Sequence, residues 1–301
     1  MPSTLAIDGP LTAGMQKELR PELIRTSRGQ VEAVSWGEGP AVLSLHGAMG
    51  GYDQGILLAQ TVTYPRFRYI AVSRPGYLGT ALRVGRTPQE QADSCAEVLK
   101  HFGVESAAVI AISGGGPAAV QFALRHSDRC RGLVMISACS DTLNVPIPFR
   151  FQIMKVMARI PGAMNTMRKK IEREPEKAAQ RSIPDEVLRR KVLEDPETRS
   201  LLMALQSSVL DRMALRLPGT ENDIRQTRGK MAYPLEQINM PTLVVHGTSD
   251  SAVPFAQAKA LASRVPGAEM LTIDGGEHIS IYTHRAQVRA TMDRFLSRCV
   301  G

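Results

Sequence analysis

Ser113 stands at the corner between an apolar run, Val109–Ile112, and a cluster of three glycines, Gly114–Gly116. A strand that turns into a helix within a few residues brings two backbones close together, and glycine permits this because it has no Cβ. A serine at such a corner projects from both elements, so its hydroxyl can serve as a nucleophile. A similar corner forms the phosphate-binding loop of dinucleotide-binding folds. The pattern around Ser113 therefore predicts one of two kinds of site.

A serine nucleophile requires a base that accepts its proton and a carboxylate that orients the base. Asp250 follows the apolar run Thr242–His246, and His278 follows the run Glu269–Ile273. If both runs are parallel strands beside the one that ends at Ser113, their carboxyl ends meet at one edge of a sheet. Ser113, Asp250 and His278 are then expected to lie together and to perform acyl transfer.

Two other residues compete for these roles. Asp141 follows the preceding apolar run and is the alternative acid, while His284 lies six residues after His278 and is the alternative base. His284 is assigned to the first turn of the last helix, which leaves His278 as the expected base. His46 and His246 each close the end of a strand, and His46 is expected to stabilise the loop that follows it.

The elements that position these residues alternate between short apolar strands and helices, which predicts an α/β fold with a mostly parallel, doubly wound sheet. Segment 30–36 alternates polar and apolar residues, as an exposed edge strand does. Thr87–Glu90 forms a capping box with proline at the first helical position. The expected strands are 30–36, 41–45, 69–73, 107–112, 133–137, 242–246 and 269–273, and the expected helices are 88–102, one that ends near 126, 255–264 and 284–298.

This alternation stops between about residues 143 and 233. The segment is rich in Met, Arg, Glu and Leu, shows no convincing strand, and is divided by seven prolines. It therefore predicts several amphipathic helices inserted into the sheet domain as a lid. The expected organisation is a core domain of residues 1–142 and 234–301 with a helical cap of residues 143–233.

Four motifs together resemble α/β-hydrolase fold proteins over roughly residues 24–298. They are His46–Gly47 after an early strand, the Ser113 corner, Asp250 in a Gly-x-x-Asp-x-x-Val-Pro loop, and His278 after two glycines. The chain order of serine, acid and histidine is also the order of that fold. One departure is Ala111, which stands where the usual Gly-x-Ser-x-Gly has its first glycine. Alanine is the smallest change from glycine, so we expect it to be tolerated.

The resemblance implies a role for each residue that matches a motif. Ser113 would be the nucleophile, His278 the general base and then acid, and Asp250 the carboxylate that orients His278. The backbone N–H groups of Ala48 and Gly114 would bind the oxyanion. No cofactor and no metal ion are implied.

Two other classes of protein compete with this interpretation. Gly114–Ala119 also matches the G-x-G-x-x-A pattern of flavin or nicotinamide proteins, but two buried strands precede it, and Asp141 is the only acidic candidate near the expected distance. A yellow purified protein, or tight dinucleotide binding, would support that reading. A binding protein on the hydrolase scaffold that has lost turnover is the second alternative. Covalent labelling of Ser113 and ester turnover distinguish it from an enzyme.

Composition and charge narrow the remaining classes of function and of binding partner. The chain has 301 residues and a formal net charge of +8. About +6 of that charge lies between Leu143 and Asn239, where basic residues sit beside acidic ones as on a solvated helix face, so neither nucleic acid nor stable membrane insertion is expected. Met1–Asp8 lacks the basic and apolar regions of a signal peptide, which favours a cytoplasmic location. The cysteines, Cys95, Cys130, Cys139 and Cys299, have no metal-binding spacing.

We therefore expect a metal-free serine hydrolase that cleaves a small to medium, partly apolar carboxylic ester through an acyl-enzyme. Thioesters, lactones, amides, N-terminal prolyl peptides and carbon–carbon bonds can be cleaved with the same three side chains. The partner expected is thus a small ester-like molecule, and the oligomeric state is not predicted.

Overall fold

The computed structural model describes residues 19–143, 146–147, 149–229 and 231–300. The N-terminal stretch considered above lies outside these residues. Within them, an eight-stranded sheet runs in the order β1-β2-β4-β3-β5-β6-β7-β8. β1 and β2, and β2 and β4, pair antiparallel, while all other neighbours are parallel. The strands are β1 (Glu22–Thr26), β2 (Gly29–Trp36), β3 (Ala41–Leu45), β4 (Arg68–Val72), β5 (Ala107–Ile112), β6 (Cys130–Ile136), β7 (Thr242–Gly247) and β8 (Glu269–Ile273).

The prediction that segment 30–36 is an exposed edge strand is wrong. β1 pairs with β2 on one side and β4 pairs with it on the other, so β1 occupies the edge. Two of the polar residues that produced the alternating pattern, Glu32 and Ser35, are buried and hydrogen-bonded. The carboxylate of Glu32 accepts from the hydroxyl of Ser73 and from the N–H of Gly79, and the hydroxyl of Ser35 accepts from Arg68.

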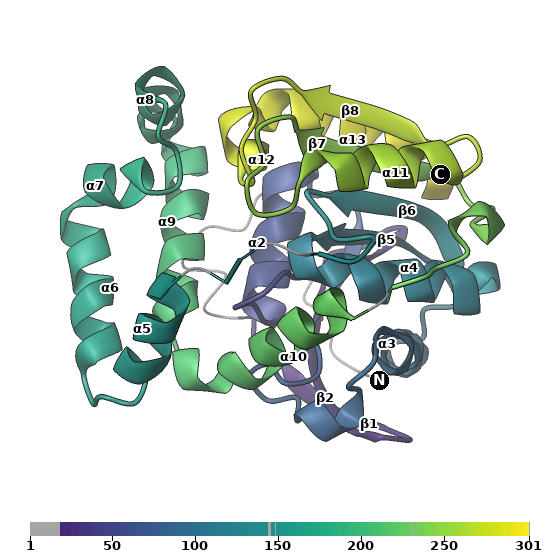
Figure 1. Cartoon of the computed structure of the whole chain (residues 1–301). Coiled ribbons are helices and arrows are strands. Elements are labelled where there is room, and N and C mark those ends of the chain that lie inside the picture. Colours follow the sequence, from purple (N-terminus) through teal and green to yellow (C-terminus); the bar gives the residue numbers. More distant parts are fainter. Residues whose placement is uncertain (1–18, 144–145, 148, 230, 301) are drawn as a thin grey trace.

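Helices cover both faces of the sheet (Figure 1). On one face, α3, α4 and α11 enclose a core with the strands, and on the other, α2 and α13 do so. The predicted capping box at Thr87 is present, with Thr87 and Glu90 each accepting the other's backbone N–H. The helices of the sheet domain are α2 (Tyr52–Val62), α3 (Pro88–His101), α4 (Gly116–Arg125), α11 (Phe255–Arg264), α12 (Ser280–Thr283) and α13 (Arg285–Val300).

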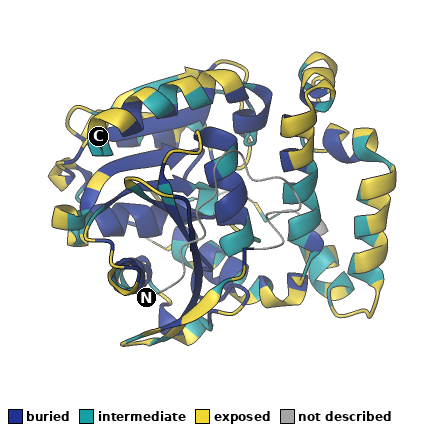
Figure 2. Ribbon diagram, turned by 180° about the vertical axis from the view of Figure 1, so that it is seen from behind, coloured by how far each residue is buried: buried dark blue, intermediate teal, exposed yellow. Residues whose placement is uncertain are grey.

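Between β6 and β7 the described residues form helices and no strand. Figure 1 shows α5–α9 beside the sheet domain, with α10 running from the lower end of α9 toward the sheet domain. Ala179, Ile183, Val192, Leu201 and Leu202 of this segment join the same core as α2 and α13. Its outer side is largely exposed (Figure 2). The helices are α5 (Phe149–Met157), α6 (Ala163–Arg173), α7 (Pro175–Gln180), α8 (Glu186–Glu194), α9 (Pro196–Leu210) and α10 (Leu217–Arg228).

Five short 3₁₀ turns connect these elements in the described chain: η1 (Leu82–Val84), η2 (Ser113–Gly115), η3 (Ser127–Arg129), η4 (Met213–Leu215) and η5 (Leu235–Gln237). Two of them bear on the site. η2 carries Ser113 from β5 into α4, and η4 leads the chain into α10. None of the described helices combines the length and the apolar composition needed to cross a bilayer.

Candidate active site

Ser113 follows β5 directly and has φ of +53°, in the left-handed region that residues with a side chain rarely adopt. This backbone makes the sharp turn from strand to helix and leaves the hydroxyl at the carboxyl edge of the sheet. Ala111, the departure from the usual pattern, is fully buried within β5 and packs in the core with α3 and α4. Its methyl group is therefore accommodated two residues before the turn.

The structure brings Ser113, His278 and Asp250 into one hydrogen-bonded chain. The Nε2 atom of His278 lies 3.1 Å from the Oγ atom of Ser113, and its Nδ1 atom lies 2.8 Å from Oδ2 of Asp250. These contacts join residues far apart in sequence, because β5, β7 and β8 deliver their loops to one edge of the sheet. The arrangement has the distances that a base needs to accept a serine proton.

Asp250 is held as an anion. Burial alone would raise its pKa, but hydrogen bonds from His246 and His278 keep that pKa well below its ordinary value. Oδ1 also accepts the backbone N–H groups of Ala252 and Val253, at 2.9 Å each. A fixed, ionised carboxylate of this kind orients the imidazole and stabilises its protonated form.

The two alternative residues lie elsewhere. The carboxylate of Asp141 accepts the backbone N–H of Thr142, and the backbone carbonyl of Asp141 accepts from Gln257. His284 lies between α12 and α13, with Nδ1 at 2.9 Å from the hydroxyl of Thr283. Neither is seen in contact with Ser113 or His278, so the geometry favours Asp250 and His278 for the two roles.

From the sequence, His246 is expected only to close the end of its strand, but in the structure it also contacts Asp250. It is fully buried, and its Nε2 atom lies 2.8 Å from the carbonyl oxygen of Val253 and 3.3 Å from Oδ2 of Asp250. Since a carbonyl only accepts, Nε2 carries a proton and can also donate toward the carboxylate. The signal in the sequence is a histidine four residues before the candidate acid, at the end of the same strand.

The loop after β3 packs against the Ser113 corner. A methyl group built on Gly47 would lie 3.0 Å from Cβ of Ser113, and one built on Gly114 would lie 3.4 Å from the amide nitrogen of Ala48. The two backbone amides predicted to bind an oxyanion, those of Ala48 and Gly114, therefore belong to segments in contact beside Ser113. Backbone donors at such a position stabilise charge that develops during acyl transfer.

His46 holds this loop from within. Its Nε2 atom accepts the backbone N–H of Arg74 at 3.0 Å, which leaves Nδ1 to donate to the carbonyl of Gly47 at 2.7 Å. Burial, and then the charge of Arg74, hold the pKa of His46 well below 6.5, so the ring is neutral at pH 7. The expected stabilising role of His46 thus has a specific form, a hydrogen bond to the carbonyl of Gly47.

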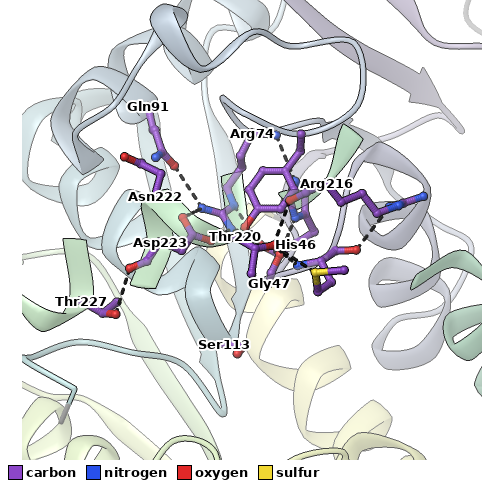
Figure 3. A network of polar contacts seen from close by, with 12 residues as sticks. His46, Gly47, Arg74, Gln91, Ser113, Arg216, Thr220, Asn222, Asp223 and Thr227 are labelled. Carbon is purple, nitrogen blue, oxygen red and sulfur yellow. Dashed lines mark hydrogen bonds and ion pairs between the residues drawn. The ribbon is translucent and has the colours of Figure 1, made fainter. Parts of the chain in front are cut away.

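Arg74 and Asp223 are the members of this neighbourhood that the sequence did not indicate. Figure 3 shows the guanidinium of Arg74 between His46 and Asp223, with Ser113 nearby. Both side chains are almost completely buried. Charged residues in loops and on helices are ordinarily expected to be exposed, and the separation of 149 positions between these two hides the pairing from any local pattern.

The described residues contain no group of three or more His, Cys, Asp or Glu side chains placed to hold a metal ion.

Comparison with known proteins shows which family the chain belongs to. Residues 40–285 match the family described as the alpha/beta hydrolase fold. The chain belongs to this family. That result confirms the predicted fold class, with the mostly parallel eight-stranded sheet and helices on both of its faces.

Three relatives show how far the similarity extends. An alpha/beta hydrolase fold protein from Nakamurella multipartita has 32% sequence identity and a TM-score of 0.83, over 93% of this chain and all of that one. A poly(3-hydroxyalkanoate) depolymerase from Ectopseudomonas oleovorans is 25% identical over 78% of this chain and 76% of its own length. The uncharacterized hydrolase YcgS from Bacillus subtilis is 29% identical over 47% of this chain, and the match spans half of that protein.

The contact between Gly47 and Ser113 leads to a first prediction. If Ser113 is the nucleophile, Gly47→Ala is expected to lower kcat/KM for a 4-nitrophenyl ester by about 10²-fold, because the added methyl group displaces Ser113 relative to the amides of Ala48 and Gly114. Gly229→Ala is the matched control, since its methyl group would lie 3.3 Å from the carbonyl of Gln226, away from Ser113. Equal activity in both variants would contradict the prediction.

The buried neutral His46 leads to a second prediction, on stability. The unfolded chain takes up a proton on His46 below about pH 6.5, whereas the folded chain does so only at lower pH, so the free energy of unfolding falls on acidification. His46→Gln removes this titration. Between pH 6.5 and 5 the wild type should lose about 1 kcal/mol per pH unit more than the variant in urea unfolding. Parallel pH profiles for the two proteins would show that His46 titrates equally in both states.

Proposed function

We propose that the protein is a serine hydrolase that cleaves a small to medium, partly apolar carboxylic ester. The observation that carries the proposal is the hydrogen-bonded chain from Ser113 through His278 to the buried Asp250. Membership of the hydrolase family and similarity to a hydrolase and a depolymerase support hydrolysis in general. The serine mechanism and the ester substrate rest on the side chains themselves.

The reaction begins when Nε2 of His278 accepts the proton of Ser113 as its oxygen attacks the ester carbonyl. The carbonyl oxygen becomes an oxyanion that the N–H groups of Ala48 and Gly114 bind. When the tetrahedral intermediate collapses, His278 returns its proton to the departing alcohol and an acyl-Ser113 ester remains. Water then attacks this ester, with His278 again as base, and the acid leaves. Asp250 stabilises the imidazolium in both halves of the reaction.

We also propose that residues 143–233 form a cap over a core domain of residues 1–142 and 234–301. Two contacts support this division. Asp223 on α10 lies beside Gly114, and residues 182–185 and 188 share a cavity of about 110 Å³ with residues 275, 277, 279, 280 and 283, which surround His278 in sequence. Substrates would therefore be selected by the helical segment, whereas the chemistry belongs to the core.

A substrate panel tests the proposed function. Acyl esters of 4-nitrophenol with two to eight carbons, matching thioesters, a set of lactones and aminoacyl amides are assayed with the wild type and with Ser113→Ala. The proposal requires that esters give the highest kcat/KM and that the variant lose this activity. Preference for thioesters, lactones or amides would assign the same three side chains to another acyl bond, and no Ser113-dependent turnover would refute the proposal.

A further inference from the structure

A buried ion pair connects the helical segment to the loop beside Ser113. Arg74 follows β4 and Asp223 lies on α10, and the two side chains pair in a fork. Nη1 of Arg74 lies 3.0 Å from Oδ1 of Asp223, and Nη2 lies 2.5 Å from Oδ2. Tyr77 donates to Oδ2 of Asp223 at 2.6 Å, and Gln91 accepts from Nη1 of Arg74 at 3.2 Å. Paired and hydrogen-bonded in this way, two buried charges are accommodated.

The same guanidinium donates hydrogen bonds to the backbone of the loop after β3. Nε of Arg74 donates to the carbonyl of His46 at 2.9 Å, and Nη2 donates to the carbonyl of Gly47 at 3.3 Å. The Gly47 carbonyl therefore receives two donors, from Arg74 and from the ring of His46 (Figure 3). Turning this carbonyl away from Arg74 and His46 would break both bonds.

The peptide between Gly47 and Ala48 is planar and trans, so its C=O and N–H point in opposite directions. Fixing the Gly47 carbonyl toward Arg74 and His46 consequently turns the N–H of Ala48 the other way. Asp223 also approaches this region directly, because a methyl group on Gly114 would lie 3.1 Å from its Oδ2 atom. We call the Arg74–Asp223 pair, with its hydrogen bonds to the carbonyls of His46 and Gly47, the clamp. Asp223 thus belongs to the clamp and also lies beside Gly114, the second predicted oxyanion donor.

We infer that Asp223 is a positioning residue for the oxyanion hole. It acts through Arg74, which holds the Gly47 carbonyl so that the Ala48 N–H is directed toward the reacting carbonyl oxygen. This inference rests on the proposed function, since it concerns the efficiency of acyl transfer at Ser113. It also gives the helical segment a part in the chemistry besides substrate selection.

Other contacts hold α10 against the loop after β3 and its neighbours. Thr220 on α10 accepts the backbone N–H of Met49 at 3.0 Å, and Gly219 donates its N–H to the carbonyl of Gly76 at 2.8 Å. Arg216, just before α10, is buried and forms a second fork with the partly exposed Asp53 at the start of α2. The start of α10, just before Asp223, is therefore fixed to the core.

The test uses Asp223→Asn, which keeps the shape of the side chain and removes its charge. The matched control is Glu197→Gln, which breaks another ion pair between the helical segment and the core. Glu197 pairs with Arg285, which also donates to the hydroxyl of Thr198 and to the carbonyls of Gln60 and Thr61 at the far end of α2. Both variants loosen the helical segment, but only Asp223→Asn disturbs the clamp.

Three quantities are measured for each protein: kcat and KM for 4-nitrophenyl butyrate, and the inhibition constant of phenylboronic acid, whose adduct with Ser113 places an oxygen in the oxyanion hole. Asp223→Asn should lower kcat by about 10-fold to 100-fold and change KM by less than about 3-fold. It should weaken the binding of phenylboronic acid by a factor similar to the loss in kcat. Glu197→Gln should stay within about 2-fold of the wild type in kcat and in boronate affinity.

The inference would be overturned if Asp223→Asn kept the kcat of the wild type or changed only KM. It would also be overturned if Asp223→Asn and Glu197→Gln lost equal activity. If Asp223→Asn fails to fold, Thr220→Val takes its place. It removes the acceptor of the Met49 N–H and should give a smaller loss with the same preference for kcat over KM, and the opposite preference would overturn the inference. A wild type without Ser113-dependent turnover would refute the proposed function itself, which separates that failure from failure of the clamp.

Discussion

The Ser113→Ala variant is expected to lose ester turnover by about 10⁴-fold to 10⁶-fold. The alanine has no oxygen that can form an acyl-enzyme, and water must then attack the substrate directly with only the oxyanion donors to assist. Binding of the substrate should persist, because the hydroxyl contacts His278 and no other described side chain. Initial rates with 4-nitrophenyl esters, measured on protein of identical folded fraction, give the comparison.

The control for that variant is Ser137→Ala. Ser137 is a buried serine at the end of the neighbouring β6, also with positive φ, and its hydroxyl has no hydrogen-bond partner among the described residues. It should retain nearly full activity. Comparable losses in the two variants would mean that Ser113 matters for folding rather than for bond cleavage.

Asp250→Asn is expected to lower kcat by about 10⁴-fold with little change in KM. Asparagine keeps the backbone contacts of the loop but cannot stabilise a protonated His278, and its amide hydrogens favour the wrong tautomer of the ring. Asp141→Asn, in contrast, should leave kcat close to that of the wild type, since Asp141 contacts Thr142 instead of His278. If Asp141→Asn lost more activity than Asp250→Asn, the assignment of the acid would be wrong.

Much of the core architecture could be predicted because local patterns decide it. Strand 107–112 and helix 255–264 were predicted with the bounds that the structure shows, since continuous apolar runs and a helical period mark buried strands and packed helices. Ser113, Asp250 and His278 could be proposed together because Ser113 directly follows such a strand and the other two lie in the loops after two more. Parallel pairing then fixes their common edge of the sheet.

What the sequence could not show are polar groups whose partners lie far away. Glu32 looked like the solvent side of an edge strand, yet Ser73 and Gly79 satisfy its carboxylate in the interior. Arg74 and Asp223 are both buried for the same reason, since each supplies the charge that the other needs. Burial of a charged residue depends on a partner, and local periodicity carries no information about that partner.

The account depends most on Ser113 being a nucleophile that forms a covalent intermediate. Incubation with a fluorophosphonate, followed by intact-mass and peptide mass spectrometry, tests this directly. We predict one adduct per chain, located on the peptide that contains Ser113, absent from Ser113→Ala and formed much more slowly in Asp250→Asn. An unlabelled wild type, or an adduct that persists in Ser113→Ala, would contradict the account.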